Sequence, residues 1–241
     1  RLVSDPQANP TVQKTAAEAL RQIVVSDPRV KDAAAPQLFQ ELSEAYYAEK
    51  ESLRPDRKDD RANVWVVDGP TVKPIDVPRE IFCMVMSMQT ARASLALAKD
   101  QPQVLALWLA ANFRRESRLG LDVQTAEQVA VDDPSHADDF PRSIYFARSA
   151  GPAVCGLVLS RGLKDLDRPV ALGAIAGLAV TAGPGAFQPQ GQQGPGLAEA
   201  IRFPDQLVRL KAAFVLARIL PKESFSGANE VVTVLSTAFR S

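Results

Sequence analysis

The feature that most constrains this chain is a recurring motif in which a helix-capping residue is followed by Val, Ala and Leu at helical spacing. Three copies fit, and they begin at Asn9, Asp167 and Asp205. The apolar positions share one face of an α-helix, and the capping oxygen can accept the free N–H groups of the first turn. A looser copy starts at Val104, with Trp108 in the Ala position. The recurrence predicts a chain of stacked helices.

The spacing of the copies indicates how the helices are organised. The valines of the last two copies, Val170 and Val208, lie 38 residues apart. This interval is close to the period of solenoids built from helix pairs. The wider gaps back to Val104 and Val12 require additional helices or insertions. We therefore predict an all-α fold, a right-handed α-α superhelix of about five or six helical hairpins.

The C-terminal copy resembles the second helix of a HEAT repeat. Six positions carry the resemblance: Asp205, Val208, Arg209, Ala212, Ala213 and Leu216. In that family the Asp caps the helix, and the Arg often bonds the Asp of the neighbouring repeat. The other copies lack the Arg. The resemblance to HEAT and armadillo-like α-solenoids implies an architecture and a binding scaffold, without a particular chemistry. Residues 88–116 also have a tetratricopeptide-like character, but the HEAT pattern is the sharper match.

Residues 54–77 interrupt the helical pattern. A run of mixed charges, 54–61, predicts a solvated loop, and 63–67 and 71–77 have strand composition on either side of an Asp68-Gly69 turn. We predict a β-hairpin insertion. Because an isolated hairpin is marginally stable, it should pack on the helices, and we expect Trp65 to make that contact. Contact between Trp65 and a binding partner is the alternative.

Three arginines, Arg114, Arg115 and Arg118, cluster at the C-terminal end of a helix predicted over 103–119. Positive charge at that end offsets the helix dipole, which is one interpretation of the cluster. The other is that these arginines bind an anion or a protein partner. Together with Arg209 and Trp65, they are our candidate partner-binding residues.

Residues 120–141 form an acidic linker. It contains the only histidine, His136, and six acids: Asp122, Glu127, Asp132, Asp133, Asp138 and Asp139. The calcium-loop pattern with its central Gly is absent. From Phe140 onward, eleven Lys and Arg stand against six Asp and Glu. We expect the linker to fold back along the basic helix ends through exposed pairs, each contributing less than about 1 kcal/mol. A free, solvated spacer is the alternative.

Composition limits the chemistry of the chain. A formal net charge of zero provides no long-range attraction to nucleic acid or membrane. Cys83 and Cys155 lie in apolar helical stretches, which predicts buried free thiols. A single histidine excludes most catalytic triads and most metal sites. The glycine-rich segment 183–196 lacks the ending of a phosphate loop. We therefore predict no cofactor, no metal and no membrane insertion.

These observations lead to one expected function and one alternative. We expect a single HEAT-like domain over 1–241, a piece of a longer protein because the chain begins with Arg. It would act as a non-catalytic scaffold that binds a protein or another domain of the same chain. The alternative is an enzyme that resembles the HEAT-like alkylpurine DNA glycosylases in fold and size. The zero net charge disfavours nucleic-acid binding, which relies on Lys and Arg. A cytoplasmic location is slightly favoured, and no oligomeric state is predicted.

Overall fold

The computed structural model describes residues 3, 6–69, 71–183, 196–219 and 228–238. This part of the chain is mostly helical and includes one small antiparallel sheet. Most of the predicted glycine-rich segment lies outside the described residues. Pro221 also lies outside the described residues, and the helix predicted after Asp205 is expected to end there because proline cannot continue a helix.

The α-helices of the described residues are joined by connections of very different length. Their bounds are α1 Pro10–Ser26, α2 Ala35–Tyr47, α3 Arg79–Leu97, α4 Pro102–Arg118, α5 Ser143–Lys164, α6 Arg168–Thr181, α7 Leu197–Ala200, α8 Gln206–Ile219 and α9 Ala228–Ala238. The hairpin lies between α2 and α3, and the acidic linker lies between α4 and α5. Two 3₁₀ turns, η2 Pro28–Lys31 and η3 Glu51–Leu53, flank α2. α5 has a kink at Gly151, whose φ of 82° is accessible to glycine, so its two halves differ in direction.

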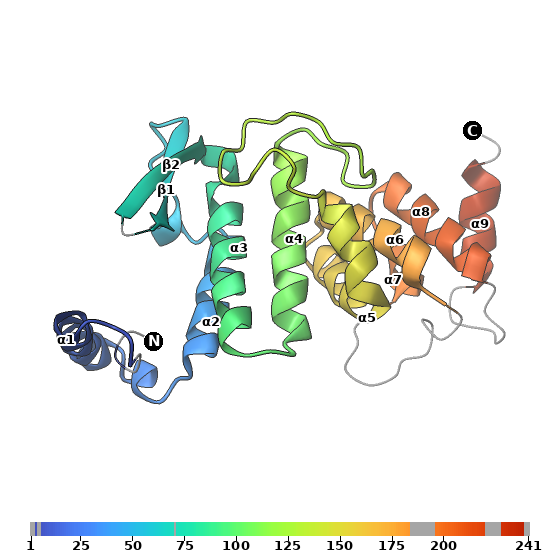
Figure 1. Cartoon of the computed structure of the whole chain (residues 1–241). Coiled ribbons are helices and arrows are strands. Elements are labelled where there is room, and N and C mark those ends of the chain that lie inside the picture. The colour runs from blue at the N-terminus through green and yellow to red at the C-terminus, as the bar shows by residue number, and fades with distance from the viewer. Residues whose placement is uncertain (1–2, 4–5, 70, 184–195, 220–227, 239–241) are drawn as a thin grey trace.

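From α2 to α9, helices that are close in sequence pack on one another. α2 packs on α3, α3 on α4, α4 on α5, α5 on α6, α6 on α8, and α8 on α9. Figure 1 shows these helices in a row that follows chain order. A continuous core runs between them, and α4 and α6 approach closely at Gly173. A Cβ atom added to Gly173 would lie 2.3 Å from the ring of Phe113, so this contact requires glycine.

The motif predicts the helix starts correctly. Asp167 and Asp205 accept hydrogen bonds from the backbone N–H groups of Val170 (3.1 Å) and Val208 (3.0 Å). Asn9 likewise caps α1 by accepting from the N–H of Thr11 at 2.8 Å. The apolar positions of the last two copies are also buried as predicted: Val170, Ala174, Leu178, Val208, Ala212 and Leu216.

α1 departs from the predicted packing. It has the apolar stripe of the motif, but none of its residues is buried, and Val12 and Leu20 are exposed. Its main contact is with η2, and Figure 1 shows it apart from the row of helices. An amphipathic sequence specifies that a helix has a face suited to burial, but it does not supply a partner for that face.

The polar link expected between neighbouring helices is formed by different residues. Arg209 donates to the carbonyl oxygens of Phe203 (2.9 Å) and Pro204 (2.7 Å), both just before α8. Asp205 instead pairs with Arg168, the residue after the Asp167 cap, at 3.0 Å. The start of α8 is therefore joined to the start of α6 through Arg168.

The predicted hairpin is present, with β1 over Arg61–Asp68 and β2 over Thr71–Pro78. The strands pair antiparallel, and Asp68 lies opposite Thr71. The hairpin packs on α3 through the buried side chains of Val64 and Val77. The prediction that Trp65 makes this contact is wrong, because 62% of Trp65 is exposed. Side chains alternate between the two faces of a strand, so burying Val64 turns Trp65 outward.

Candidate functional site

The candidate partner-binding residues lie in three separate places. Arg114, Arg115 and Arg118 belong to the last turns of α4, Arg209 to the first turn of α8, and Trp65 to the middle of β1. The structure does not bring them together into one site.

Arg114 is occupied by oxygens of its own chain. Its guanidinium hydrogen-bonds the carboxylate of Asp167 at 2.6 Å and the carbonyl oxygen of Tyr47 at 2.9 Å. It also lies 3.9 Å above the ring of Tyr47, where the positive charge is attracted to the π face. Burial raises the pKa of the Tyr47 phenol. Arg114 therefore links α4 to the end of α2 and to the cap of α6.

Arg118 has a similar role on a neighbouring side of α4. Its two terminal nitrogens bind both carboxylate oxygens of Glu49, each at 2.8 Å, and one also donates to the carbonyl oxygen of Glu80 at 2.6 Å. The hydrogen bonds from Arg118 lower the pKa of Glu49 despite its partial burial. A bidentate pair, in which two arginine nitrogens bind the two oxygens of one carboxylate, fixes the relative orientation of both groups. Arg118 thus connects α4 to the segment after α2 and to the start of α3.

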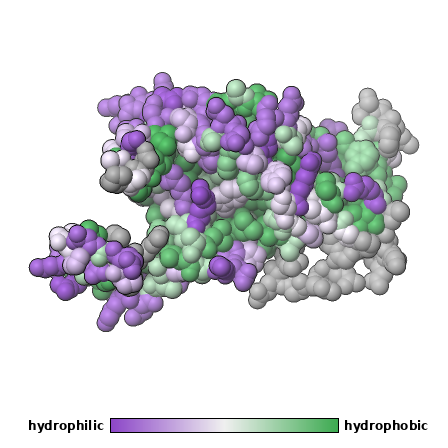
Figure 2. All heavy atoms as spheres, in the orientation of Figure 1, coloured by the Kyte–Doolittle hydropathy of each residue, from purple (hydrophilic) through white to green (hydrophobic). Residues whose placement is uncertain are grey.

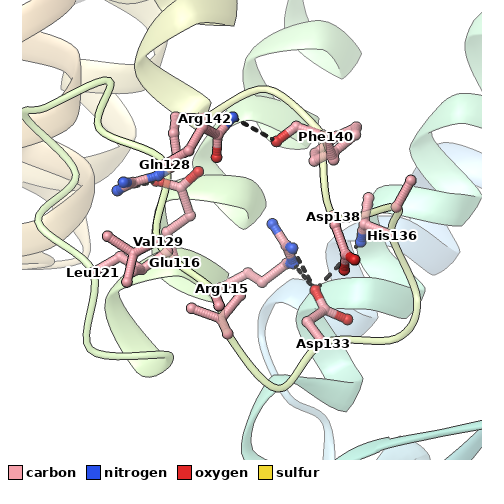
Figure 3. Close-up of a pocket in the computed structure, with 13 residues that line it drawn as sticks. Arg115, Glu116, Leu121, Gln128, Val129, Asp133, His136, Asp138, Phe140 and Arg142 are labelled. Atoms are coloured by element: carbon pink, nitrogen blue, oxygen red, sulfur yellow. Dashed lines mark hydrogen bonds and ion pairs between the residues drawn. The ribbon is translucent and has the colours of Figure 1, made fainter.

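Arg115 binds the acidic linker. Its guanidinium pairs with the carboxylate of Asp133, and only 6% and 1% of the two side chains are exposed. The linker therefore folds back onto α4, as Figure 3 shows, but the expectation that exposed pairs hold it is wrong for this contact. The remaining guanidinium nitrogen, Nη1 of Arg115, donates to Oδ1 of Asn112 at 2.9 Å. The next acid, Asp132, forms an exposed pair with Arg61 of β1 at 2.5 Å.

Residues of the linker itself complete the surroundings of Asp133. The backbone N–H of Ser135 donates to it at 3.0 Å, and Nδ1 of His136 lies 3.3 Å from it. Burial opposes ionisation, but the hydrogen bonds from His136 and Ser135 and the charge of Arg115 outweigh it. Together they hold the pKa of Asp133 well below its ordinary value.

Ser135, His136 and Asp133 do not have the geometry of a catalytic triad. In a triad the carboxylate and the nucleophile occupy different ring nitrogens of the histidine. Here Ser135 Oγ lies 2.9 Å from Nδ1 of His136, the same atom that faces Asp133. The His136 ring packs against Phe140, with centroids 4.2 Å apart. The cluster orders the linker and cannot relay a proton from serine to aspartate through the ring.

A pocket of about 280 Å³ lies under the linker, as Figure 3 shows. Arg142 forms part of its wall and binds Glu116 at 3.1 Å and the carbonyl oxygen of Asp122 at 2.9 Å. Glu116 in turn accepts from the N–H (2.6 Å) and hydroxyl (2.7 Å) of Ser143 at the start of α5. Nε of Arg142 is buried without a partner among the described residues. Arg115 is paired with Asp133 and Arg142 with Glu116, so these four groups neutralise one another. Asp138 also lines the pocket and is exposed.

The outward face of the hairpin differs from these occupied sites. Three large apolar side chains are exposed there: Trp65 (62%), Val67 (80%) and Val72 (61%). Val67 lies opposite Val72, and Trp65 lies opposite Pro74. In Figure 2, hydrophilic residues predominate at the top left of the molecule, where the hairpin lies, and a hydrophobic patch interrupts them farther along the top. The outward face of the hairpin is therefore a small apolar surface.

An open groove of about 530 Å³ lies beside this face. One wall is β1 from Trp65 to Val67, and the other is the C-terminal half of α3, from Gln89 to Ala96. Arg92 lies in the groove, is exposed, and forms no hydrogen bond or ion pair with the described residues. Sequence reasoning found Trp65 but missed Arg92 and the groove. The groove and the place of Arg92 in it depend on which face of the hairpin packs on α3. No local sequence pattern determines which face packs there.

The Asp133 contact predicts acid sensitivity of the linker. A carboxyl group with a lowered folded-state pKa contributes stability above its ordinary pKa of about 3.9, and this contribution is lost as pH falls below that value. We expect hydrogen exchange in 119–142 to accelerate between about pH 4 and pH 2 relative to α4, after correction for the intrinsic rate. In an Asp133→Asn variant this pH dependence should be reduced, and an unchanged dependence would contradict the assignment.

The described residues contain neither a membrane-spanning helix nor a cluster of metal ligands. No helix among the described residues is both long and apolar enough to cross a bilayer. In the same part of the chain, no group of three or more His, Cys, Asp or Glu side chains could hold a metal ion. Compared with protein-family models, curated proteins and solved structures, the chain matches none of them.

Proposed function

We propose that this chain is a non-catalytic helical-repeat module that binds another protein or another domain of its own chain. We further propose that its helices form a HEAT-like, right-handed superhelix of the kind predicted from the motif. The capped starts of α6 and α8 and the packing of successive helices support this architecture. Repeat modules of this type present extended surfaces to their partners.

The observation that carries the proposal is the outward face of the hairpin. Single exposed apolar residues are common on protein surfaces, but Trp65, Val67 and Val72 lie together on one side of the sheet. Tryptophan is enriched among the residues that contribute most to protein–protein binding. A hairpin packed on α3 that holds a tryptophan in solvent beside an open groove is therefore well suited to receive a partner.

The arginines enter this proposal in a different role. The donors of Arg114, Arg115 and Arg118 bind oxygens of the same chain and connect α4 to its neighbours. We therefore assign partner binding to the Trp65 face and structural roles to these three residues. The surroundings of Trp108 also favour a binding module over a base-stacking enzyme. Trp108 is buried and packs edge-on against Phe146, with ring centroids 5.0 Å apart.

A site-specific crosslinker tests the proposal. With a photoreactive residue in place of Val72, extract from the source organism should yield a dominant protein adduct. The same residue in place of Lys50, which is exposed near the end of α2, should not yield that adduct. Adding Trp65→Ser should greatly reduce the adduct with little change in stability, because the side chain is largely solvated. Equal adducts from both positions, or an adduct insensitive to Trp65→Ser, would refute a binding role for this face.

A further inference from the structure

We infer that the groove between β1 and α3 receives an extended segment of a partner protein, which pairs with the free edge of β1 as a third strand and places a carboxylate against Arg92. This inference rests on the proposed function and specifies the chemistry of the partner. Three observations carry it: the direction in which the edge of β1 faces, the difference between the two edges of the sheet, and the unpartnered charge of Arg92.

The groove runs along the backbone edge of β1. Trp65, Val66 and Val67 are consecutive, so their side chains point alternately to opposite faces of the sheet. All three nevertheless line the groove, and no residue of β2 does. In the described sheet of two strands, β2 occupies one edge of β1. The groove must therefore follow the other edge, whose outward N–H and C=O groups have no strand to pair with.

The two outer edges of the sheet differ in their suitability for a new strand. β2 contains Pro74 and ends at Pro78, and proline lacks the N–H group needed to continue a hydrogen-bonded ladder. β1 contains no proline and has the sequence Val-Trp-Val-Val from residue 64 to 67. Valine and tryptophan are favoured in strands. The edge that faces the groove is thus the better template for strand addition.

The opposite wall combines small and larger side chains of α3. Ala93 and Ala96 have small side chains, and Gln89, Arg92 and Leu95 lie beside them. A third strand would lie about 4.8 Å from β1 and would direct every second side chain toward α3. A helix in the same place could not use the N–H and C=O groups of the β1 edge, because its own backbone groups are already paired.

Arg92 indicates the charge of the partner. It is the one charged residue among those that line the groove, and it has no partner among the described residues. Among the residues that the structure describes, no acidic side chain lines the groove to neutralise it. A peptide with Asp, Glu or a C-terminal carboxylate at this point would form a charge-assisted hydrogen bond. The preferred ligand is therefore an extended, apolar segment that carries one acidic group.

Selection from a display library of short random peptides tests the inference. The intact chain should enrich peptides in which apolar residues alternate and one acidic group occupies a constant position. Arg92→Glu should select Lys or Arg at that position and should weaken binding of the original peptides by about tenfold or more. Lys211→Glu is the matched control, because Lys211 is an exposed cation on α8, which does not line the groove, and the substitution should change neither result.

The peptide backbone provides a second and independent readout. N-methylation of single peptide positions should reduce binding at every second position, because alternate N–H groups of an added strand face β1. Enriched peptides with helical spacing, an acid preference unchanged by Arg92→Glu, uniform N-methyl effects, or no enrichment would each overturn the inference. If any of these occurs while the Val72 crosslink remains, the proposed function stands and the partner binds the hairpin face as a folded surface.

Discussion

Replacing Asp133 with Asn should lower the free energy of unfolding by about 3–5 kcal/mol. Asp133 and Arg115 are both buried, and removing one charge of such a pair leaves the other uncompensated in a low-dielectric environment. The neutral amide can retain some hydrogen bonds to Ser135. The loss of stability should therefore come mainly from the Arg115 guanidinium, which remains buried without its carboxylate. Urea denaturation followed by circular dichroism measures the change, read from the midpoint at constant slope.

The adjacent residue provides the control. Asp132 also pairs with an arginine, Arg61, but 63% of its side chain is exposed. The same substitution, Asp132→Asn, should therefore change stability by less than about 1 kcal/mol. Equal losses from the two variants would show that burial of Asp133 is not what makes its pair important.

Replacing both Asp133 and Arg115 shows whether the loss of stability comes from a buried charge left without a partner or from loss of the ion pair itself. Arg115→Met alone should also be strongly destabilising, because it leaves Asp133 buried without its cation. Combining Arg115→Met with Asp133→Leu removes both charges, and the double variant should be more stable than the sum of the two losses predicts. Simple additivity would contradict a direct coupling between the two side chains.

Leu216→Ala should destabilise the chain by about 2–5 kcal/mol through loss of buried surface and formation of a cavity. Leu216 lies on the buried face of α8, which packs against α6, α7 and α9. If each helix pair couples mainly to its neighbours, hydrogen-exchange protection should fall most in α6–α9 and least in α2 and α3. Equal loss of protection as far as α2 would contradict that coupling.

A second residue of α8 serves as the control for Leu216. Phe214 is part of the same helix but is exposed. Phe214→Ala should have a much smaller effect, although it removes a larger side chain, because little buried surface is lost. A comparable effect at Phe214 would show that helix propensity or local structure dominates, and that core packing contributes little.

Several features of this chain followed from its sequence because they are decided locally. The caps at Asn9, Asp167 and Asp205 needed only an acceptor beside the first turn of a helix. The hairpin needed two strand-forming runs and the turn at Gly69, whose φ is +59°. The buried stripe of α8 followed from helical spacing.

The candidate site, in contrast, was decided by contacts between segments that are distant in sequence. Packing of Val64 against α3 turned Trp65 to the surface and set the groove beside Arg92. The position of the acidic linker on α4 buried Asp133 and left its neighbour Asp132 exposed, although both are aspartates in one polar run. Local patterns determine which face of an element is apolar, because they depend on spacing along the chain. Only the tertiary structure decides which apolar face is packed against another element and which charged side chain is buried away from solvent. Both outcomes depend on segments that are distant in sequence and pack against that face or side chain.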